Sequence, residues 1–267
     1  MQTSAVYRTA DLGPGIRSMN ILLVGGSGLV GTFITPYLQQ HHTLRVLDVA
    51  PPQHTDIDYM EGSITDLDTL PRALDGMDTF ITMVMKGGQG GFKKDHTIQQ
   101  TIDNYSVNCL GLHLLLHTAV EMGIQNGVYT STMSVHNRAR TWYPSEEESS
   151  RDGPNVYGLT KRFGEDICCY FAGEFDMDLA VLRITGPSTR AQFIDRLKKP
   201  PGPPKLYYTD EEDLANAYLA AVDFVQSRQG RCEVFFISGD TAHEEMNMSK
   251  AKVLLGWEPR TQKNLGM

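Results

Sequence analysis

Tyr157 and Lys161 are the two side chains in this sequence whose types and spacing best suit proton transfer. They stand four residues apart within a predicted helix, 156–175, and therefore share one face of it. A free tyrosine, with a pKa of about 10, is a poor base at neutral pH, but a neighbouring ammonium favours the phenolate. The pair could then take a proton from a substrate hydroxyl. The same spacing also occurs on solvated helix faces, so this interpretation depends on the surrounding chain.

A hydroxyl donor at the end of a nearby strand would complete such a site by holding the reacting oxygen. Thr132 directly follows the predicted strand 127–131 and is positioned for this role.

A glycine loop supplies the second chemical signal. Gly25, Gly28 and Gly31 lie between the apolar run 21–24 and the helix-like segment 29–38. Such a loop turns tightly, lets a diphosphate approach the backbone, and directs a helix N-terminus at its negative charge. The pattern indicates a dinucleotide site, although an ordinary strand-to-helix turn has the same appearance.

Two carboxylates follow the loop. Asp48 ends the predicted strand 44–48, 23 residues after Gly25, close to the ~20 expected of an acid that binds the adenosine ribose. A carboxylate there repels a 2′-phosphate, and no arginine follows in 49–52, so NAD is favoured over NADP. A solvated strand-end carboxylate is the alternative. Asp66 either binds the adenine amine or begins a helix capped by Thr65.

Strands and helices alternate along the chain, which predicts an α/β, Rossmann-like, doubly wound parallel sheet with ligands at the carboxyl ends of its strands. We expect residues 19–267 to form one such domain, with a small C-terminal substrate-binding cap made mainly by 185–209 and 238–257. Residues 1–18 are expected to be a flexible extension or an added segment. The glycine-rich stretch 86–94 is either a mobile flap over the site or a simple connector. The predicted strands are 21–24, 44–48, 57–60, 78–85, 127–131, 179–184 and 233–237, and the main helices are 29–38, 97–122, 156–175 and 210–225.

Composition restricts the partners. The net charge of −8 argues against nucleic acid or an anionic membrane, and no apolar run approaches the roughly 20 residues that span a bilayer. The four cysteines lack metal-ligand spacing, and we expect no metal. A small-molecule substrate and a cytoplasmic location are therefore predicted.

The order of these motifs resembles the extended short-chain dehydrogenase/reductase family, in its NAD-dependent epimerase/dehydratase branch, from about Asn20 to Trp257. Asn108-Cys109-Leu110-Gly111, Leu182-Arg183-Ile184, Asp213-Leu214-Ala215 and Leu255-Gly256-Trp257 add to the resemblance. It implies that Tyr157 is the acid/base, Lys161 its electrostatic partner that also grips the nicotinamide ribose, and Thr132 the donor to the substrate oxygen. It also implies a homodimer through helices 97–122 and 156–175. Asn108 would support the lysine or be only a helix-face amide, and Gly25, Gly28, Leu29, Gly31, Asp48 and Asp66 would hold NAD.

Departures from the family narrow the reaction. Dehydratases of this branch carry an Asp-Glu pair after the catalytic threonine, whereas Met133-Ser134 stand here and cannot transfer those protons. The cap is short, as in uronate dehydrogenase-like members, which favours a compact substrate. Arg190 in the cap could clamp a substrate carboxylate, or could be a surface arginine.

The sequence thus predicts an NAD-dependent oxidoreductase acting on a secondary alcohol of a small sugar, sugar acid or polyol. An epimerase that retains its cofactor and a non-catalytic NAD-sensing protein are the alternatives.

Overall fold

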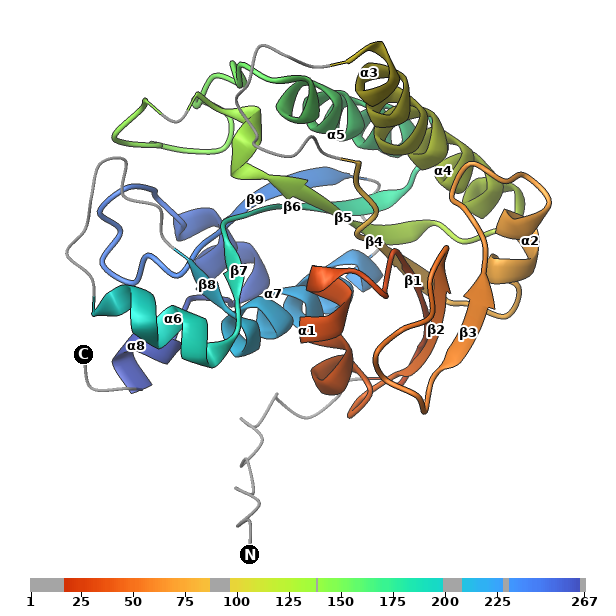
Figure 1. Cartoon of the computed structure of the whole chain (residues 1–267), viewed down its shortest axis with the longest axis horizontal. Helices are drawn as coiled ribbons and strands as arrows, with labels where there is room; N and C mark the ends of the chain where they lie inside the picture. The colour runs from red at the N-terminus through yellow and green to blue at the C-terminus, as the bar shows by residue number, and fades with distance from the viewer. Residues whose placement is uncertain (1–16, 87–96, 138, 199–207, 228–230, 265–267) are drawn as a thin grey trace, which may run out of the picture.

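The computed structural model describes residues 17–86, 97–137, 139–198, 208–227 and 231–264. Its centre is a parallel sheet in the order β3-β2-β1-β4-β5-β6-β9 (Figure 1). The chain moves outward from β1 to β3 and then returns to β4 on the other side of β1, so the winding direction reverses between β1 and β4. The prediction of a doubly wound parallel sheet is therefore confirmed. The strands are β1 Asn20–Val24, β2 Thr43–Asp48, β3 Asp58–Glu61, β4 Thr79–Thr82, β5 Asn126–Thr132, β6 Asp178–Ile184 and β9 Cys232–Ile237.

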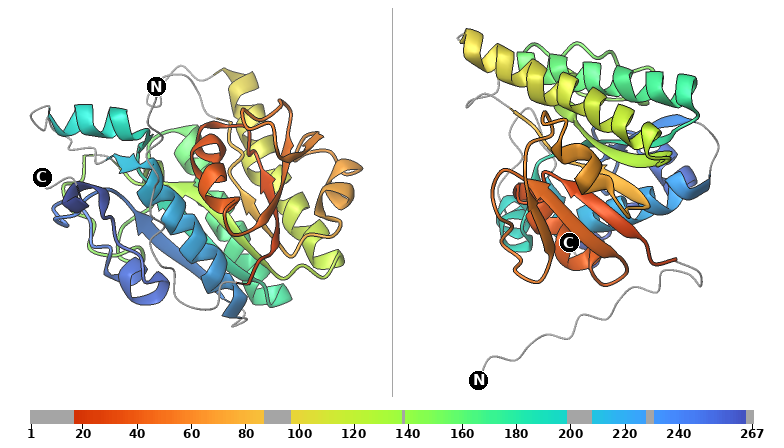
Figure 2. Two further views of the ribbon diagram at one scale, coloured as in Figure 1. Left: turned by 90° about the horizontal axis from the view of Figure 1, so that it is seen from below. Right: turned by 90° about the vertical axis from the view of Figure 1, so that its right-hand side faces the viewer.

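Both faces of the sheet are buried because successive side chains of a strand point to opposite sides. In β1, Ile21 and Leu23 join one apolar cluster, while Leu22 and Val24 join the other. Helices α1 (Leu29–Leu38) and α7 (Glu211–Phe224) cover the first face. The second face carries α2 (Thr69–Leu74), α4 (Leu112–Glu121) and α5 (Val156–Phe175), and Figure 2 shows α4 and α5 lying along this side of the sheet.

The predicted helix 97–122 is present, but it contains a π-helical turn. Helix α3 (Ile98–Tyr105) runs into the turn Ser106–Gly111, which continues directly as α4. Gly111 packs against Ile64, which lies in the segment before α2. A Cβ on Gly111 would lie only 2.6 Å from Cγ2 of Ile64. Turns of this kind inside α-helices are frequent at functional sites, and Asn108 lies within this one.

Helix α2 begins later than predicted, at Thr69 rather than Asp66. The carboxylate of Asp66 accepts hydrogen bonds from the backbone N–H of Asp68 at 3.0 Å and from the hydroxyl of Thr69 at 2.6 Å. These contacts hold residues 66–68 in a turn ahead of the helix, because an aspartate side chain competes for backbone N–H groups.

Short elements follow β6 on the side of the cap. Strands β7 (Pro187–Ser188) and β8 (Thr209–Asp210) pair in parallel, with α6 (Arg190–Leu197) between them in sequence. The carboxylate of Asp213 accepts the backbone N–H groups of Arg260 and Thr261, which fastens the C-terminal segment and its helix α8 (Thr261–Asn264) to α7.

Some sequence predictions fall outside the described residues. These are most of the extension 1–18, the stretch 86–94 apart from Lys86, and the middle of the cap at 199–207. In the part of the chain that the structure describes, no helix is long and apolar enough to cross a bilayer.

Candidate active site

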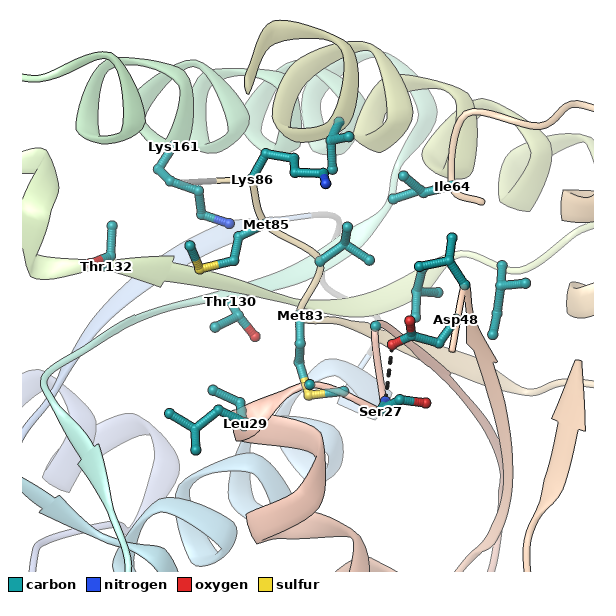
Figure 3. Close-up of a pocket in the computed structure, with 18 of the residues that line it drawn as sticks. Ser27, Leu29, Asp48, Ile64, Met83, Met85, Lys86, Thr130, Thr132 and Lys161 are labelled. Carbon is teal, nitrogen blue, oxygen red and sulfur yellow. Dashed lines mark hydrogen bonds between the residues drawn. The ribbon is translucent and has the colours of Figure 1, made fainter. Parts of the chain in front are cut away.

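A cavity of about 610 Å³ lies at the carboxyl ends of the strands, around the point where the winding reverses. Figure 3 shows Asp48 at one end of this cavity and Lys161 with Thr132 toward the other, with Met83 and Met85 between them. The predicted cofactor loop and the predicted catalytic residues therefore face one shared space.

The glycine loop forms the floor of the cavity between β1 and α1. Gly25 has a φ of +82°, and a Cβ on it would lie 2.8 Å from Cγ2 of Val84. Gly28 and Leu29 line the cavity directly. A Cβ on Gly31 would meet the carbonyl oxygen of Gly26 at 2.1 Å, so this glycine permits the close approach of α1 to the loop. The three positions thus provide the tight turn, the open backbone and the helix packing that a diphosphate site requires.

Asp48 is held in place beside this loop. Its carboxylate accepts hydrogen bonds from the backbone N–H of Ser27 at 3.0 Å and of Ala50 at 3.3 Å, and it lines the cavity (Figure 3). A carboxylate fixed by two N–H groups keeps free lone pairs toward the cavity, where ribose hydroxyls could donate to it. Gly25, Gly28, Gly31 and Asp48 together fit an NAD molecule.

Asp66 does not share this position. Ser63 and Ile64 line the cavity, whereas the carboxylate of Asp66 is exposed and bound to Asp68 and Thr69, outside the cavity wall formed by the described residues. The hydrogen bond from Thr69 lowers the pKa of Asp66. In this structure Asp66 therefore acts as a turn former, and the backbone at 62–64 lies nearer the cavity.

The N-terminus of α5 places Tyr157 beside the end of β5. The side chain of Asn155 caps the helix by accepting the N–H of Gly158 at 2.7 Å. A Cβ on Gly158 would lie 2.1 Å from the carbonyl oxygen of Ser134, so the helix can press against the turn that follows Thr132 only because this residue is glycine. Tyr157 and Thr132 both line the cavity.

Lys161 reaches the cavity from the next turn of α5. Its side chain is only 2% exposed, and its Nζ lies 4.2 Å from the centre of the Tyr129 ring. Burial lowers the pKa of Lys161 to about 8, because desolvation disfavours the ammonium. The lysine is still mainly protonated at neutral pH, and its charge lies at a poorly solvated site, where charges are weakly screened.

The hydroxyl of Thr132 is oriented by its own backbone. Its Oγ1 accepts the N–H of Ser134 at 3.1 Å. Because this contact uses a lone pair of the oxygen, the hydroxyl proton can be donated to a group in the cavity.

Asn108 is connected to Lys161 only indirectly. Its Nδ2 donates to the carbonyl of Lys86 at 2.9 Å and to Oγ1 of Thr160 at 3.0 Å, and its Oδ1 accepts the N–H of Lys86 at 2.9 Å. Asn108 thus ties the segment after β4 to the residue that precedes Lys161 on α5. Any support that it gives to the lysine passes through the helix.

Arg190 is engaged elsewhere. It forms two hydrogen bonds with Asp210, at 2.6 and 2.9 Å, and a third with Glu212 at 2.6 Å. A guanidinium neutralised by two carboxylates is not placed to clamp a substrate carboxylate, and Arg190 does not belong to the described cavity wall. The structure thus places Arg190 in an ion-pair cluster with Asp210 and Glu212.

The sequence did not predict a buried ion pair that lies close to the predicted catalytic residues. The carboxylate of Glu165 accepts hydrogen bonds from Nε and Nη2 of Arg183, at 2.9 and 2.8 Å, and from the hydroxyl of Ser131, at 2.6 Å. Burial would raise the pKa of Glu165, but the hydrogen bonds and charge of Arg183 lower it overall. Glu165 follows Lys161 by four residues and Ser131 precedes Thr132, so the network links the two elements, α5 and β5, that carry the predicted catalytic residues. A glutamate on a buried helix face and an arginine within an apolar strand were the available signals.

The sequence of this chain matches a known protein family and several relatives. A model of the NAD dependent epimerase/dehydratase family matches residues 21–197. The chain is 37% identical over 120 residues to a 3 beta-hydroxysteroid dehydrogenase/Delta 5-->4-isomerase of Mycobacterium tuberculosis, a match that covers 43% of the chain. The matched segment spans only 32% of that enzyme's own length.

Solved structures share the fold over nearly the whole chain. A mutated uronate dehydrogenase has a TM-score of 0.71 at 21% identity, covering 90% of this chain and 81% of the other. A UDP-glucose 4-epimerase from Brucella ovis in complex with NAD has a TM-score of 0.70 at 19% identity, covering 91% and 94%. At these identities the likeness concerns the fold.

Proposed function

The chain belongs to the NAD dependent epimerase/dehydratase family, and we propose that it is an NAD-dependent dehydrogenase acting on a secondary alcohol of a small sugar, sugar acid or polyol. One observation carries the proposal. Thr132, Tyr157 and Lys161 face the same cavity as the glycine loop and Asp48. Groups for moving a proton and groups for holding NAD are therefore adjacent, as hydride transfer requires.

The three catalytic side chains have different tasks in this reaction. Bound NAD supplies the hydride acceptor. Tyr157, as phenolate, takes the proton of the substrate hydroxyl, and Thr132 donates a hydrogen bond to the same oxygen. Lys161 stabilises the phenolate and contacts the nicotinamide ribose. The nearly complete burial of Lys161 strengthens its effect, because little water screens the charge.

The substrate is proposed to be compact. Fewer than thirty residues separate Arg183 from Asp213, which leaves a small cap. Met133 and Ser134 follow Thr132 and provide no acid and base for the elimination of water. These features favour simple oxidation and reduction, without a nucleotide carried on the substrate.

Activity measurements test this function. The purified protein is incubated with NAD and a panel of sugars, uronic acids and polyols, while NADH absorbance and product NMR spectra are recorded. We expect NADH formation that falls by roughly 10²–10⁴ in Tyr157→Phe with NAD affinity unchanged. Tyr170→Phe, on the same helix but outside the described cavity wall, is the matched control and should keep full activity because it removes only a hydroxyl group.

Other outcomes of the same assay contradict the proposal in distinct ways. A new epimer without net NADH identifies an epimerase. Tight NAD binding with no product from any substrate of the panel indicates a binding protein instead.

We also propose a homodimer formed through α3, α4 and α5. Apolar side chains on these helices are exposed, including Ile98 at 81%, Tyr170 at 52% and Ile102 at 51%. A second copy of the chain would cover them. Ile102→Glu should convert a dimer to a monomer in light scattering, whereas Val253→Glu, on the C-terminal segment, should not. A monomeric wild type refutes this arrangement.

A cytoplasmic location is proposed as well. Its support is that all four cysteines are free thiols, which suits a reducing compartment.

A further inference from the structure

Two cysteines far apart in sequence meet at the edge of the sheet. Cys169 lies on α5 and Cys232 begins β9, and their Sγ atoms are 2.7 Å apart across a separation of 63 residues. A disulfide bond is about 2.05 Å long, so the two sulfur atoms are within about 0.7 Å of bonding distance. Helix α5 packs over the strands β6 and β9 at this place (Figure 1).

The two thiols differ in exposure and acidity. Cys169 is exposed, whereas Cys232 is partly buried. The contact with Cys232 lowers the pKa of Cys169, because a thiolate there accepts a hydrogen bond, and the same contact raises the pKa of Cys232. Cys169 therefore has the greater thiolate character and faces the solvent, as an attacking thiol must.

The remaining cysteines are poorly placed to compete for Cys169. Cys168 is fully buried among apolar side chains, and burial raises its pKa well above the usual range. Cys109 lies against the carbonyl of Thr160, with its Sγ 3.6 Å from that oxygen. Neighbouring cysteines in sequence also form strained disulfides, so the partner of Cys169 is Cys232.

We propose that Cys169 and Cys232 form a reversible disulfide, which makes this pair a redox-active site separate from the NAD cavity. With hydrogen peroxide as the oxidant, the Cys169 thiolate attacks one peroxide oxygen, the O–O bond breaks, and a sulfenic acid and hydroxide result. The Cys232 sulfur then attacks that sulfenic sulfur, the S–S bond forms, and the oxygen leaves as water. Two thiols and one peroxide give one disulfide and two waters, with two electrons passing from sulfur to oxygen. A small dithiol reverses the change.

The bond would reinforce the helix that carries the catalytic pair. Cys169 follows Lys161 by eight residues, about 12 Å along α5 at ~1.5 Å per residue. The disulfide ties this helix to β9 and closes a loop of more than sixty residues. Such a loop restricts the unfolded chain strongly, and we expect oxidation to raise Tm by roughly 10 °C.

Peptide mapping tests the proposal directly. The reduced protein is exposed to hydrogen peroxide, and separately to mixtures of reduced and oxidised glutathione, then digested without reductant and analysed by mass spectrometry. We expect a cross-linked Cys169–Cys232 peptide, an intact mass lower by two hydrogen atoms, and a rise in Tm that a dithiol reverses. Cys109→Ser, which removes a thiol outside the pair, should behave like the wild type.

Cys169→Ser should lose both the cross-link and the rise in Tm. Because Cys169 is exposed, this variant should fold, and it decides the question even where Cys232→Ser does not fold. Three results overturn the proposal: thiols that stay reduced with oxidant in excess, a cross-link between other cysteines, or a stable glutathione adduct on Cys169 with Cys232 still free. None of these readouts depends on the dehydrogenase activity.

Discussion

Replacing Asp48 with asparagine should change the choice between NAD and NADP. The carboxylate lines the cavity and is anchored by the N–H groups of Ser27 and Ala50. Asparagine has the same size and keeps one acceptor oxygen, so the loop remains held by at least one of these groups. The substitution therefore removes the charge with little change of shape.

The expected change in cofactor preference follows from two energies, the weakened hydrogen bond to the ribose of NAD and the lost repulsion of the 2′-phosphate of NADP. A ribose hydroxyl contributes about 1.5–3 kcal/mol when it donates to a charged acceptor and about 0.5–1.5 kcal/mol when it donates to a neutral one. The difference of about 1–1.5 kcal/mol means that NAD should bind Asp48→Asn about 10-fold more weakly. A 2′-phosphate carries a charge of about −1.5 to −2, and its repulsion by a carboxylate at ~4 Å is about 1 kcal/mol per unit charge in water and about 4 near a protein surface. For a charge of −1.5 to −2 these limits give roughly 1.5–2 kcal/mol in water and 6–8 kcal/mol near a protein surface. Asp48 is half-buried, so we take a value toward the water limit, about 2–4 kcal/mol. Removing this repulsion should strengthen NADP binding, and the ratio of the two affinities should shift by ~10²–10⁴.

Calorimetric titration of both cofactors, at one fixed ionic strength, measures the shift. Glu61→Gln is the matched control, because Glu61 pairs with Asp48 across β2 and β3 but lies outside the described cavity wall. This control removes the same charge from the same sheet edge and should leave the ratio unchanged. An equal ratio in wild type and Asp48→Asn, or an equal shift in both variants, would refute the role of Asp48.

Three further predictions concern the packing and ionisation around the site. Gly31→Ala should abolish NAD binding and lower Tm, because the new Cβ would lie 2.1 Å from the carbonyl oxygen of Gly26. Gly173→Ala, whose Cβ would have nothing within 4 Å, should leave the NAD affinity unchanged. Equal NAD affinities and equal Tm values in the two variants would contradict the packing argument. His136 is fully buried and its pKa is lowered by burial from 6.5 to about 4, so the neutral form is favoured in the fold. The free energy of unfolding should then fall by about 3 kcal/mol as the pH drops from 6.5 to 4, because over this range the unfolded chain binds a proton that the folded chain does not. Urea titrations at several pH values should show a weaker pH dependence of this free energy in His136→Asn, and an equal pH dependence in both proteins would contradict the prediction. Glu165→Gln should destabilise the fold by about 3–5 kcal/mol because it leaves Arg183 buried without its counter-charge. A double-mutant cycle with Arg183→Met, measured by denaturant unfolding, should show that the two losses of unfolding free energy are not additive. Additive losses would contradict an interaction between the two side chains.

Local spacing explains which parts of the site could be predicted from sequence. The strand, the three glycines and α1 fall within about twenty residues, and Tyr157 and Lys161 are one helical turn apart. Short-range periodicity determines such relations, because a strand repeats every two residues and a helix every ~3.6. The bounds of α5, 156–175, and the run of helical structure from Ile98 to Glu121 followed from the same patterns.

Contacts between distant residues gave Asn108 and Arg190 partners that the sequence does not indicate. Asn108 lies within the π-helical turn and binds Lys86 and Thr160, which are 22 and 52 residues away in the sequence. Arg190 could by its type clamp a substrate carboxylate or lie on the surface, but the pairing of β7 with β8 brings Asp210 to it. Neither side chain carries a sequence signal of these partners.

The sequence alone determined the parallel α/β order, the NAD-type loop with Asp48, and the pairing of Tyr157 with Lys161 on one helix face. These properties depend on residue type and on short, regular spacing along one element. Only the tertiary structure decided that Glu165 pairs with Arg183 beneath the site, and that Cys169 meets Cys232. Such contacts arise from the packing of whole elements against one another, and a buried charge or thiol finds its partner only after that packing is complete.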